Sequence, residues 1–272
     1  MKSTLEQVQE IKKHGYHLDI GEVISQTFEN YKKIALLSGG IIIVLVIIFF
    51  VLALGVGAIL GLAINFTDFL TDYSVGNFSA AVLLTKMGAT VLVSGLIAPV
   101  TAGIMQIAHN AETNKDFDFS TAFTHYKSKY FKDLFLATII ITFTSSAFET
   151  IIQLSHLYFF DYILTSLLGI ISFVFSMLVT LFTLLTIPFI IFGNLSAMEA
   201  IKASIVTVSK RFWIILLIMI ICFLCAMMGI FALCIGIFFT MCIYISAQYI
   251  IYRNAIPMEE KDELDEIGSA EY

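Results

Sequence analysis

The chain has 272 residues, of which 59% are hydrophobic and only 13% are charged. This balance excludes a water-soluble globular protein and indicates a chain embedded in a lipid bilayer. Acidic residues outnumber lysine and arginine, 21 to 15, which argues against nucleic-acid binding. All four cysteines lie in one apolar stretch, between Cys222 and Cys242, so a disulfide-stapled secreted fold is excluded as well.

Apolar segments that are long enough to cross a bilayer need about 20 helical residues, because the hydrocarbon core is about 30 Å thick. Four such segments lie at residues 37–64, 87–108, 134–154 and 162–192. Residues 212–252 carry no formal charge and would reach about 60 Å as one helix, so we expect a reversal between Gly229 and Gly236. The sequence therefore predicts an all-α polytopic membrane protein with six transmembrane helices.

The distribution of basic residues predicts the orientation of these helices. With six spans, every lysine and arginine except Lys86 falls on the side that holds both chain ends. Loops that are rich in lysine and arginine stay in the cytoplasm, so both termini are predicted to be cytoplasmic.

Helix-capping residues recur ahead of three pairs of spans, and each is followed fourteen positions later by a lysine: Asp19 and Lys33, Asp118 and Lys132, Ser196 and Lys210. Between cap and lysine, apolar residues at helical spacing predict an amphipathic helix. An amphipathic helix followed by two spans returns the chain to its starting side, which predicts three parallel repeats. Their approximate bounds are 19–109, 118–193 and 196–253, after a polar arm at 1–18 and before an acidic cytoplasmic tail at 254–272.

Proline and basic residues recur within these repeats. Pro99 and Pro188 lie in the second span of the first two repeats and are predicted to kink those helices. The basic residues that end the amphipathic helices are predicted to contact anionic lipid headgroups; they are Lys33, Lys132, Lys210 and Arg211. The pattern favours amphipathic helices that pack as a collar on the cytoplasmic ends of the spans, and a regulated or partner-binding role is the alternative.

Three stretches of the chain carry a family resemblance: LSAMEAIKAS at 195–204, LTIPF at 185–189 and YIIYR at 249–253. They resemble bacterial YciC-like six-span proteins and the membrane domain that precedes some glycerophosphodiester phosphodiesterases. The resemblance covers about residues 19–253 and implies a six-helix protein of the cell inner membrane, largely without assigned chemistry. We expect no phosphodiesterase activity, because no soluble segment of adequate length follows the last span.

Glu149 is the only acidic residue within a predicted span, and an ionisable residue there is a functional hypothesis by default. Hydroxyl residues surround it, including Thr142, Ser145 and Ser146. Helical rise from Lys132 places Glu149 about 26 Å along the span, near the outer interface. The pattern favours an interfacial carboxylate with hydroxyls bonded to the helix backbone, and substrate or proton handling is the alternative.

No other constellation predicts catalysis, a cofactor or a metal site. Cys222 and Cys225 lie in hydrocarbon, where a thiolate is disfavoured. His14 with His17, and His109 with Glu112, have metal-like spacings but lack completing ligands in the sequence. We therefore predict a non-enzymatic membrane scaffold or assembly and regulatory partner, with membrane lipids and a membrane protein as its partners. The alternative is a small-molecule or lipid transporter or channel, with a path between the three repeats.

Overall fold

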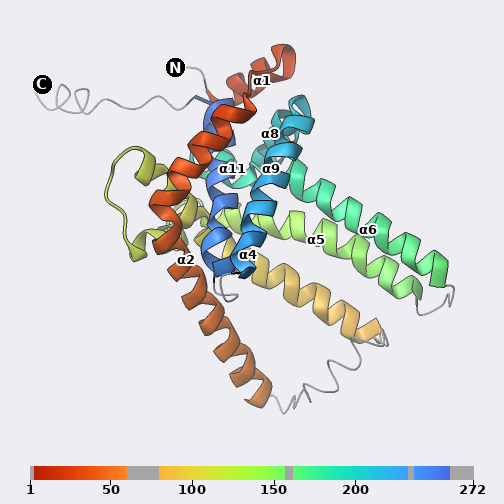
Figure 1. Cartoon of the computed structure of the whole chain (residues 1–272). Helices are drawn as coiled ribbons and strands as arrows, with labels where there is room; N and C mark the ends of the chain where they lie inside the picture. Colours follow the sequence, from red (N-terminus) through yellow and green to blue (C-terminus); the bar gives the residue numbers. More distant parts are fainter. Residues whose placement is uncertain (1–2, 60–79, 157–161, 232–235, 258–272) are drawn as a thin grey trace, which may run out of the picture.

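The computed structural model describes residues 3–59, 80–156, 162–231 and 236–257, and their regular structure is helical (Figure 1). The long helices are α2 (Ile20–Ile59), α4 (Ala80–Glu112), α5 (Phe131–His156), α6 (Tyr162–Phe182) and α9 (Phe212–Met227). The short ones are α1 (Thr4–His14), η1 (Phe119–Tyr126), α7 (Thr186–Ile191), α8 (Ala197–Lys210), η2 (Met228–Phe231), α10 (Gly236–Thr240) and α11 (Cys242–Ala255). Most of the predicted acidic tail lies outside the described residues.

Five helical segments are long and apolar enough to cross a bilayer: Ile20–Val51, Ala80–Glu112, Phe131–Ser155, Ser166–Ile191 and Phe212–Ile230. The chain is therefore a helical membrane protein. The sixth predicted span is instead divided between α10 and α11, which meet at Met241 and are each shorter than a bilayer crossing.

The helices pack together at one end of the molecule, which we call the collar end; it carries α1, α8 and the C-terminal end of α11 (Figure 1). Large side chains such as Phe189 and Ile190 are fully buried there. Towards the other end, α2 diverges from α5 and α6, and its Phe50 side chain is 63% exposed. The core of the fold thus lies at the collar end, while the far halves of the long helices expose apolar surface.

The three predicted caps are present as hydrogen bonds. The Glu22 amide donates to Asp19 Oδ1 over 2.8 Å, and the Thr121 amide donates to Asp118 Oδ1 over 3.1 Å. At the third cap, the backbone amide of Ser196 donates to the carboxylate of Glu199 over 3.1 Å.

The helices that follow these caps differ from one another, contrary to the uniform prediction. The first is continuous with the first span inside α2, because the good helix formers Ala35, Leu36 and Leu37 join them without a break. The second is the 3₁₀ helix η1, which lies so close to α4 that a Cβ at Gly103 would overlap the Ala122 backbone. The third is a separate α-helix, α8, which meets α9 at Arg211.

The two prolines have different effects on their helices. α4 continues through Pro99, and the Tyr126 hydroxyl donates to the nearby Leu96 carbonyl over 2.6 Å. Ahead of Pro188 the helix is interrupted between α6 and α7. Ser204 of α8 compensates for this break, because its Oγ donates to the Phe182 carbonyl over 2.8 Å and accepts from the Leu185 amide over 3.0 Å.

The predicted polar arm contains helix α1, which ends at His14 and is capped by Gly15 with a positive φ of 71°. Its apolar side chains Val8 and Ile11 are buried, and α1 packs against α8. Arg211 reinforces this contact, since its Nε donates to the Tyr16 carbonyl over 2.6 Å. The arm is therefore part of the collar end.

Candidate functional site: a polar junction at the collar end

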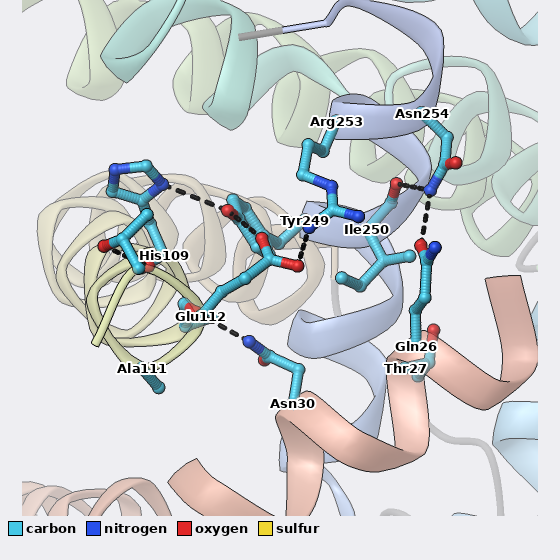
Figure 2. Close-up of polar contacts among 12 residues, drawn as sticks. Gln26, Thr27, Asn30, His109, Ala111, Glu112, Tyr249, Ile250, Arg253 and Asn254 are labelled. Carbon is cyan, nitrogen blue, oxygen red and sulfur yellow. Dashed lines mark hydrogen bonds and ion pairs between the residues drawn. The ribbon is translucent and has the colours of Figure 1, made fainter. Parts of the chain in front are cut away.

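Three helices that are distant in sequence, α2, α4 and α11, bring polar side chains together at the collar end (Figure 2). We call this cluster the polar junction; it comprises Gln26, Asn30, His109, Glu112, Tyr249, Arg253 and Asn254. Burying charged and amide groups in a membrane protein costs free energy unless these groups are paired. The role of the polar junction therefore depends on which of its side chains bond to one another.

Glu112 of α4 is the charged centre of the polar junction. It forms an ion pair with Arg253 and accepts a hydrogen bond from the Tyr249 hydroxyl. His109 Nδ1 lies 3.0 Å from the same hydroxyl. Because Tyr249 gives its only hydroxyl proton to Glu112, the His109 Nδ1 carries a proton and donates to Tyr249. A directed chain thus runs from His109 through Tyr249 to Glu112, which Arg253 neutralises.

Asn30 links α2 to both other helices of the polar junction. Its Nδ2 donates to the Ala108 carbonyl over 2.6 Å, and its Oδ1 accepts from Ser246 Oγ over 2.9 Å. The Asn30 side chain is almost fully buried, so these bonds satisfy an amide that water cannot reach. α2 and α11 are also joined by Asn254 Nδ2, which donates to Gln26 Oε1 over 2.9 Å.

Aromatic side chains fill the space beside the polar junction. Phe189 of α7 and Tyr249 and Tyr252 of α11 are at most 1% exposed. The rings of Phe189 and Tyr252 meet edge to face with their centroids 5.1 Å apart, and Phe192 meets Tyr249 at 5.7 Å. The helices at the polar junction are therefore tightly packed against one another.

Glu149, the predicted membrane site, lies at the far end of α5 and faces α4. Its Oε1 is 3.2 Å from Lys86 Nζ and accepts from Gln153 Nε2 over 2.8 Å. The two charged side chains are 45% and 50% exposed, so each remains accessible to interfacial water or headgroups. Sequence reasoning missed this pairing, although Lys86 was the one cation it placed on the outer side.

The hydroxyl residues near Glu149 bond mainly within the helices. Ser146 Oγ donates to the Thr142 carbonyl over 2.7 Å, while Ser94 of α4 donates to Thr142 Oγ1 over 3.0 Å. Ser145 is only partly buried. These bonds agree with the prediction of an interfacial carboxylate whose neighbouring hydroxyls bond to the helix backbone. A role of Glu149 in substrate or proton handling stays a prediction.

The four predicted headgroup contacts fall into two kinds. Lys132 and Lys210 are exposed at the collar end. Lys33 Nζ donates to the Ala111 carbonyl at the end of α4 over 3.1 Å, and Arg211 is held by the N-terminal arm. Two of the four cations therefore bind backbone carbonyls within the protein.

Within the described residues, no group of three or more His, Cys, Asp or Glu side chains is arranged to hold a metal ion. The described cysteines Cys222, Cys225 and Cys242 are free thiols. No protein-family model, curated protein or solved structure matches the chain. The resemblance to YciC-like proteins therefore stays a prediction.

Proposed function

We propose that the protein is a non-enzymatic membrane scaffold or assembly partner. The observation that carries this proposal is the solid collar end, where Phe189, Tyr249 and Tyr252 are buried between helices beside the neutralised Glu112–Arg253 pair. A transport path is generally lined by polar groups near the bilayer midplane, whereas the Asp, Glu, Lys, Arg and His side chains of the described long helices lie towards the helix ends. A rigid bundle with apolar outer surfaces suits packing against other membrane helices.

The proposed architecture is three parallel units, each an amphipathic helix followed by a pair of membrane helices. It is supported by the residues eight positions after each cap, Thr27, Tyr126 and Ser204. Tyr126 and Ser204 bond to carbonyls of the preceding unit's second membrane helix, at Leu96 and Phe182. In the first unit the Thr27 carbonyl accepts from Ser246 of the last unit, so equivalent positions would close a ring.

The proposed location is the cell inner membrane with both termini in the cytoplasm. In support, α11 packs back along α9, and its Arg253 meets Glu112 at the collar end, where the N-terminal arm also lies. We further propose that the exposed Lys132 and Lys210 contact anionic headgroups at that face.

Site-directed photo-cross-linking tests the scaffold proposal. A photoreactive amino acid replaces Phe173, which is 70% exposed on α6, in a tagged copy at native expression level. A scaffold gives a discrete protein adduct there, which mass analysis identifies, and the same adduct from Ile170 on the same helix. The buried Phe189 serves as the control position that gives no adduct with another protein. A monomer cross-linked only to lipid at both exposed positions contradicts the proposal.

Transport is the second candidate, because the break between α6 and α7 gives the fourth span the discontinuous form found at many transport sites. A flux assay on the reconstituted protein separates the two functions. Loss of flux in Glu149→Gln, with flux retained in Glu29→Gln at the collar end, supports transport. Absence of flux in the unmodified protein favours the scaffold.

A further inference from the structure

The break between α6 and α7 is enclosed by other helices. The six residues of α7 contact α4, α5, α8 and α11. The side chains of Phe189 and Ile190 in α7 are fully buried, and Leu184 and Leu185 just before it are at most 5% exposed. Polar groups at the break are therefore shielded from bulk water, so each of them needs a hydrogen-bond partner nearby.

Pro188 leaves one backbone acceptor of the break without its usual donor. In an α-helix, each carbonyl accepts a hydrogen bond from the amide four residues later. For Leu184 that residue is Pro188, which has no N–H. The next amide, that of Phe189, donates to the Leu185 carbonyl. The Leu184 carbonyl is thus a buried acceptor that the regular helical ladder does not satisfy.

Two hydroxyl side chains beside the break are buried without a partner. Thr186 is 2% exposed and Thr207 of α8 is fully buried, and neither hydroxyl oxygen has a hydrogen-bond partner in the part of the chain that the structure describes. Other threonines of this chain bond to the carbonyl four residues back, as Thr144 and Thr183 do. Thr186 and Thr207 are therefore two buried donors that lack the usual acceptor.

Ser204 of α8 brings these groups to one place. Its Oγ accepts from the Leu185 amide over 3.0 Å, and Leu184 and Thr186 are the two chain neighbours of Leu185. Thr207 follows Ser204 by three positions and so lies on the same face of α8. Ser204 gives its own proton to a carbonyl of α6 and accepts one hydrogen bond, which leaves one lone pair on its oxygen.

The unsatisfied groups number two donors and two acceptors. The donors are the hydroxyls of Thr186 and Thr207, and the acceptors are the Leu184 carbonyl and the remaining lone pair of Ser204. A water molecule accepts two hydrogen bonds and donates two, so a single water satisfies all four groups. A sodium ion fits less well, because it cannot accept the hydroxyl protons.

We propose that the break between α6 and α7 is a binding site for one buried water molecule. This water accepts from Thr186 and Thr207 and donates to the Leu184 carbonyl and to Ser204. It joins α7 to α8 through side chains of both helices and replaces the backbone bond that Pro188 removes. The proposal does not depend on whether the protein is a scaffold or a transporter.

A double-mutant cycle tests whether Thr186 and Thr207 share one partner. Thr186→Val and Thr207→Val each keep the shape of the side chain and remove the hydroxyl. We expect each to lower the folding equilibrium constant in detergent micelles by roughly two- to tenfold. The double variant should lose less than the product of these factors, because the first substitution already weakens the hold on the water. A loss equal to the product would overturn the proposal.

Thr183→Val provides the matched control cycle. The Thr183 hydroxyl lies at the same break but bonds directly to the Val179 carbonyl. We therefore expect Thr183→Val and Thr207→Val to combine as the product of their separate effects. The same shortfall in this cycle would show that the coupling comes from packing at the break, which also overturns the proposal.

Two measurements on the unmodified protein do not depend on how the variants fold. In a structure determined at a resolution that shows ordered water, we expect an oxygen peak within hydrogen-bond distance of both threonine hydroxyls. Direct bonds from both hydroxyls to protein atoms would overturn the proposal. Unfolding midpoints in sodium, potassium and choline chloride of equal ionic strength should agree, whereas stabilisation by sodium alone would assign the site to a cation instead of water.

Discussion

Glu112 contacts two side chains that lie four residues apart on α11, Tyr249 and Arg253. It is the residue on which the polar junction depends most. Its side chain is 23% exposed and that of Arg253 is 32% exposed, so the ion pair is largely desolvated. The sequence paired His109 with Glu112 only as a metal-like spacing. In the structure they instead share Tyr249, which donates to one and accepts from the other.

Glu112→Gln removes the charge but keeps an acceptor for Tyr249. We expect the free energy of unfolding to fall by about 1–3 kcal/mol, because the partly buried ion pair between Glu112 and Arg253 is lost. Thermal unfolding of the purified protein in detergent measures this change. Glu29→Gln, an exposed glutamate of α2, is the matched control and leaves the midpoint unchanged. Equal midpoints for the two variants would show that the ion pair contributes nothing to stability.

His125 of η1 makes the stability of the connection between α4 and α5 depend on pH. It is 6% exposed, its Nε2 has no hydrogen-bond partner, and burial lowers its pKa below the ordinary value of 6.5. The unfolded chain therefore binds a proton more readily than the folded one. Stability is full above about pH 6.5 and falls as the pH drops from there towards the lowered pKa of the folded state.

His125→Phe keeps an aromatic ring and cannot be protonated. We expect its melting temperature to decline less than that of the unmodified protein between about pH 7 and pH 5. Unfolding midpoints measured across this range for both proteins check the prediction, and their difference isolates His125 from the other histidines. Parallel curves would mean that His125 titrates alike in both states.

At the scale of elements, the contact between α4 and η1 depends on Gly103, which has no side chain. A Cβ at Gly103 would overlap the Ala122 backbone, whereas nothing lies within 4 Å of one at Gly88 in the same helix. We expect Gly103→Ala to lower the free energy of unfolding by about 2 kcal/mol or more, since backbone must move. Gly88→Ala should be neutral or stabilising by up to about 1 kcal/mol, from helix propensity. Unfolding midpoints compare the pair, and similar loss in both would refute the close contact.

The elements that sequence predicted correctly are those set by local chemistry. The caps at Asp19, Asp118 and Ser196 need only residues three positions apart, and the apolar helices follow from composition. The predicted form of the amphipathic segments was wrong because it depends on packing: the second segment is the 3₁₀ helix η1, whose Ala122 backbone lies directly against Gly103 of α4. The break before Pro188 depends likewise on Ser204, a residue of another helix.

At the scale of the whole molecule, the candidate site was beyond sequence reasoning because its contacts are distant. Asn30 bonds to a carbonyl 78 residues away, and Asn254 bonds to a side chain 228 residues away. No periodicity or spacing encodes such pairs. The Lys86–Glu149 pair was within reach, because each was an isolated charge that sequence placed near the outer side. Two opposite charges in the same apolar layer pair with each other because an isolated charge there costs free energy.

The arrangement of the whole chain is tested by the sidedness of two positions, Lys129 and Asn254. Each is replaced by cysteine in a protein whose native cysteines are alanine, and each is treated with a membrane-impermeant maleimide from either side. We expect both to react only from the cytoplasmic side, because α4, α9 and α11 all bring their connections to the collar end. Leu84→Cys, at the opposite end of α4, reacts only from the other side and serves as the reference.

Each proposed unit returns the chain to the side on which it started, so the proposed ring requires both positions to lie on one side. Labelling of Lys129→Cys and Asn254→Cys from opposite sides would require an odd number of crossings between them. The contacts that Ser246 and Arg253 make with α2 and α4 could not then form, and the proposed ring would be excluded.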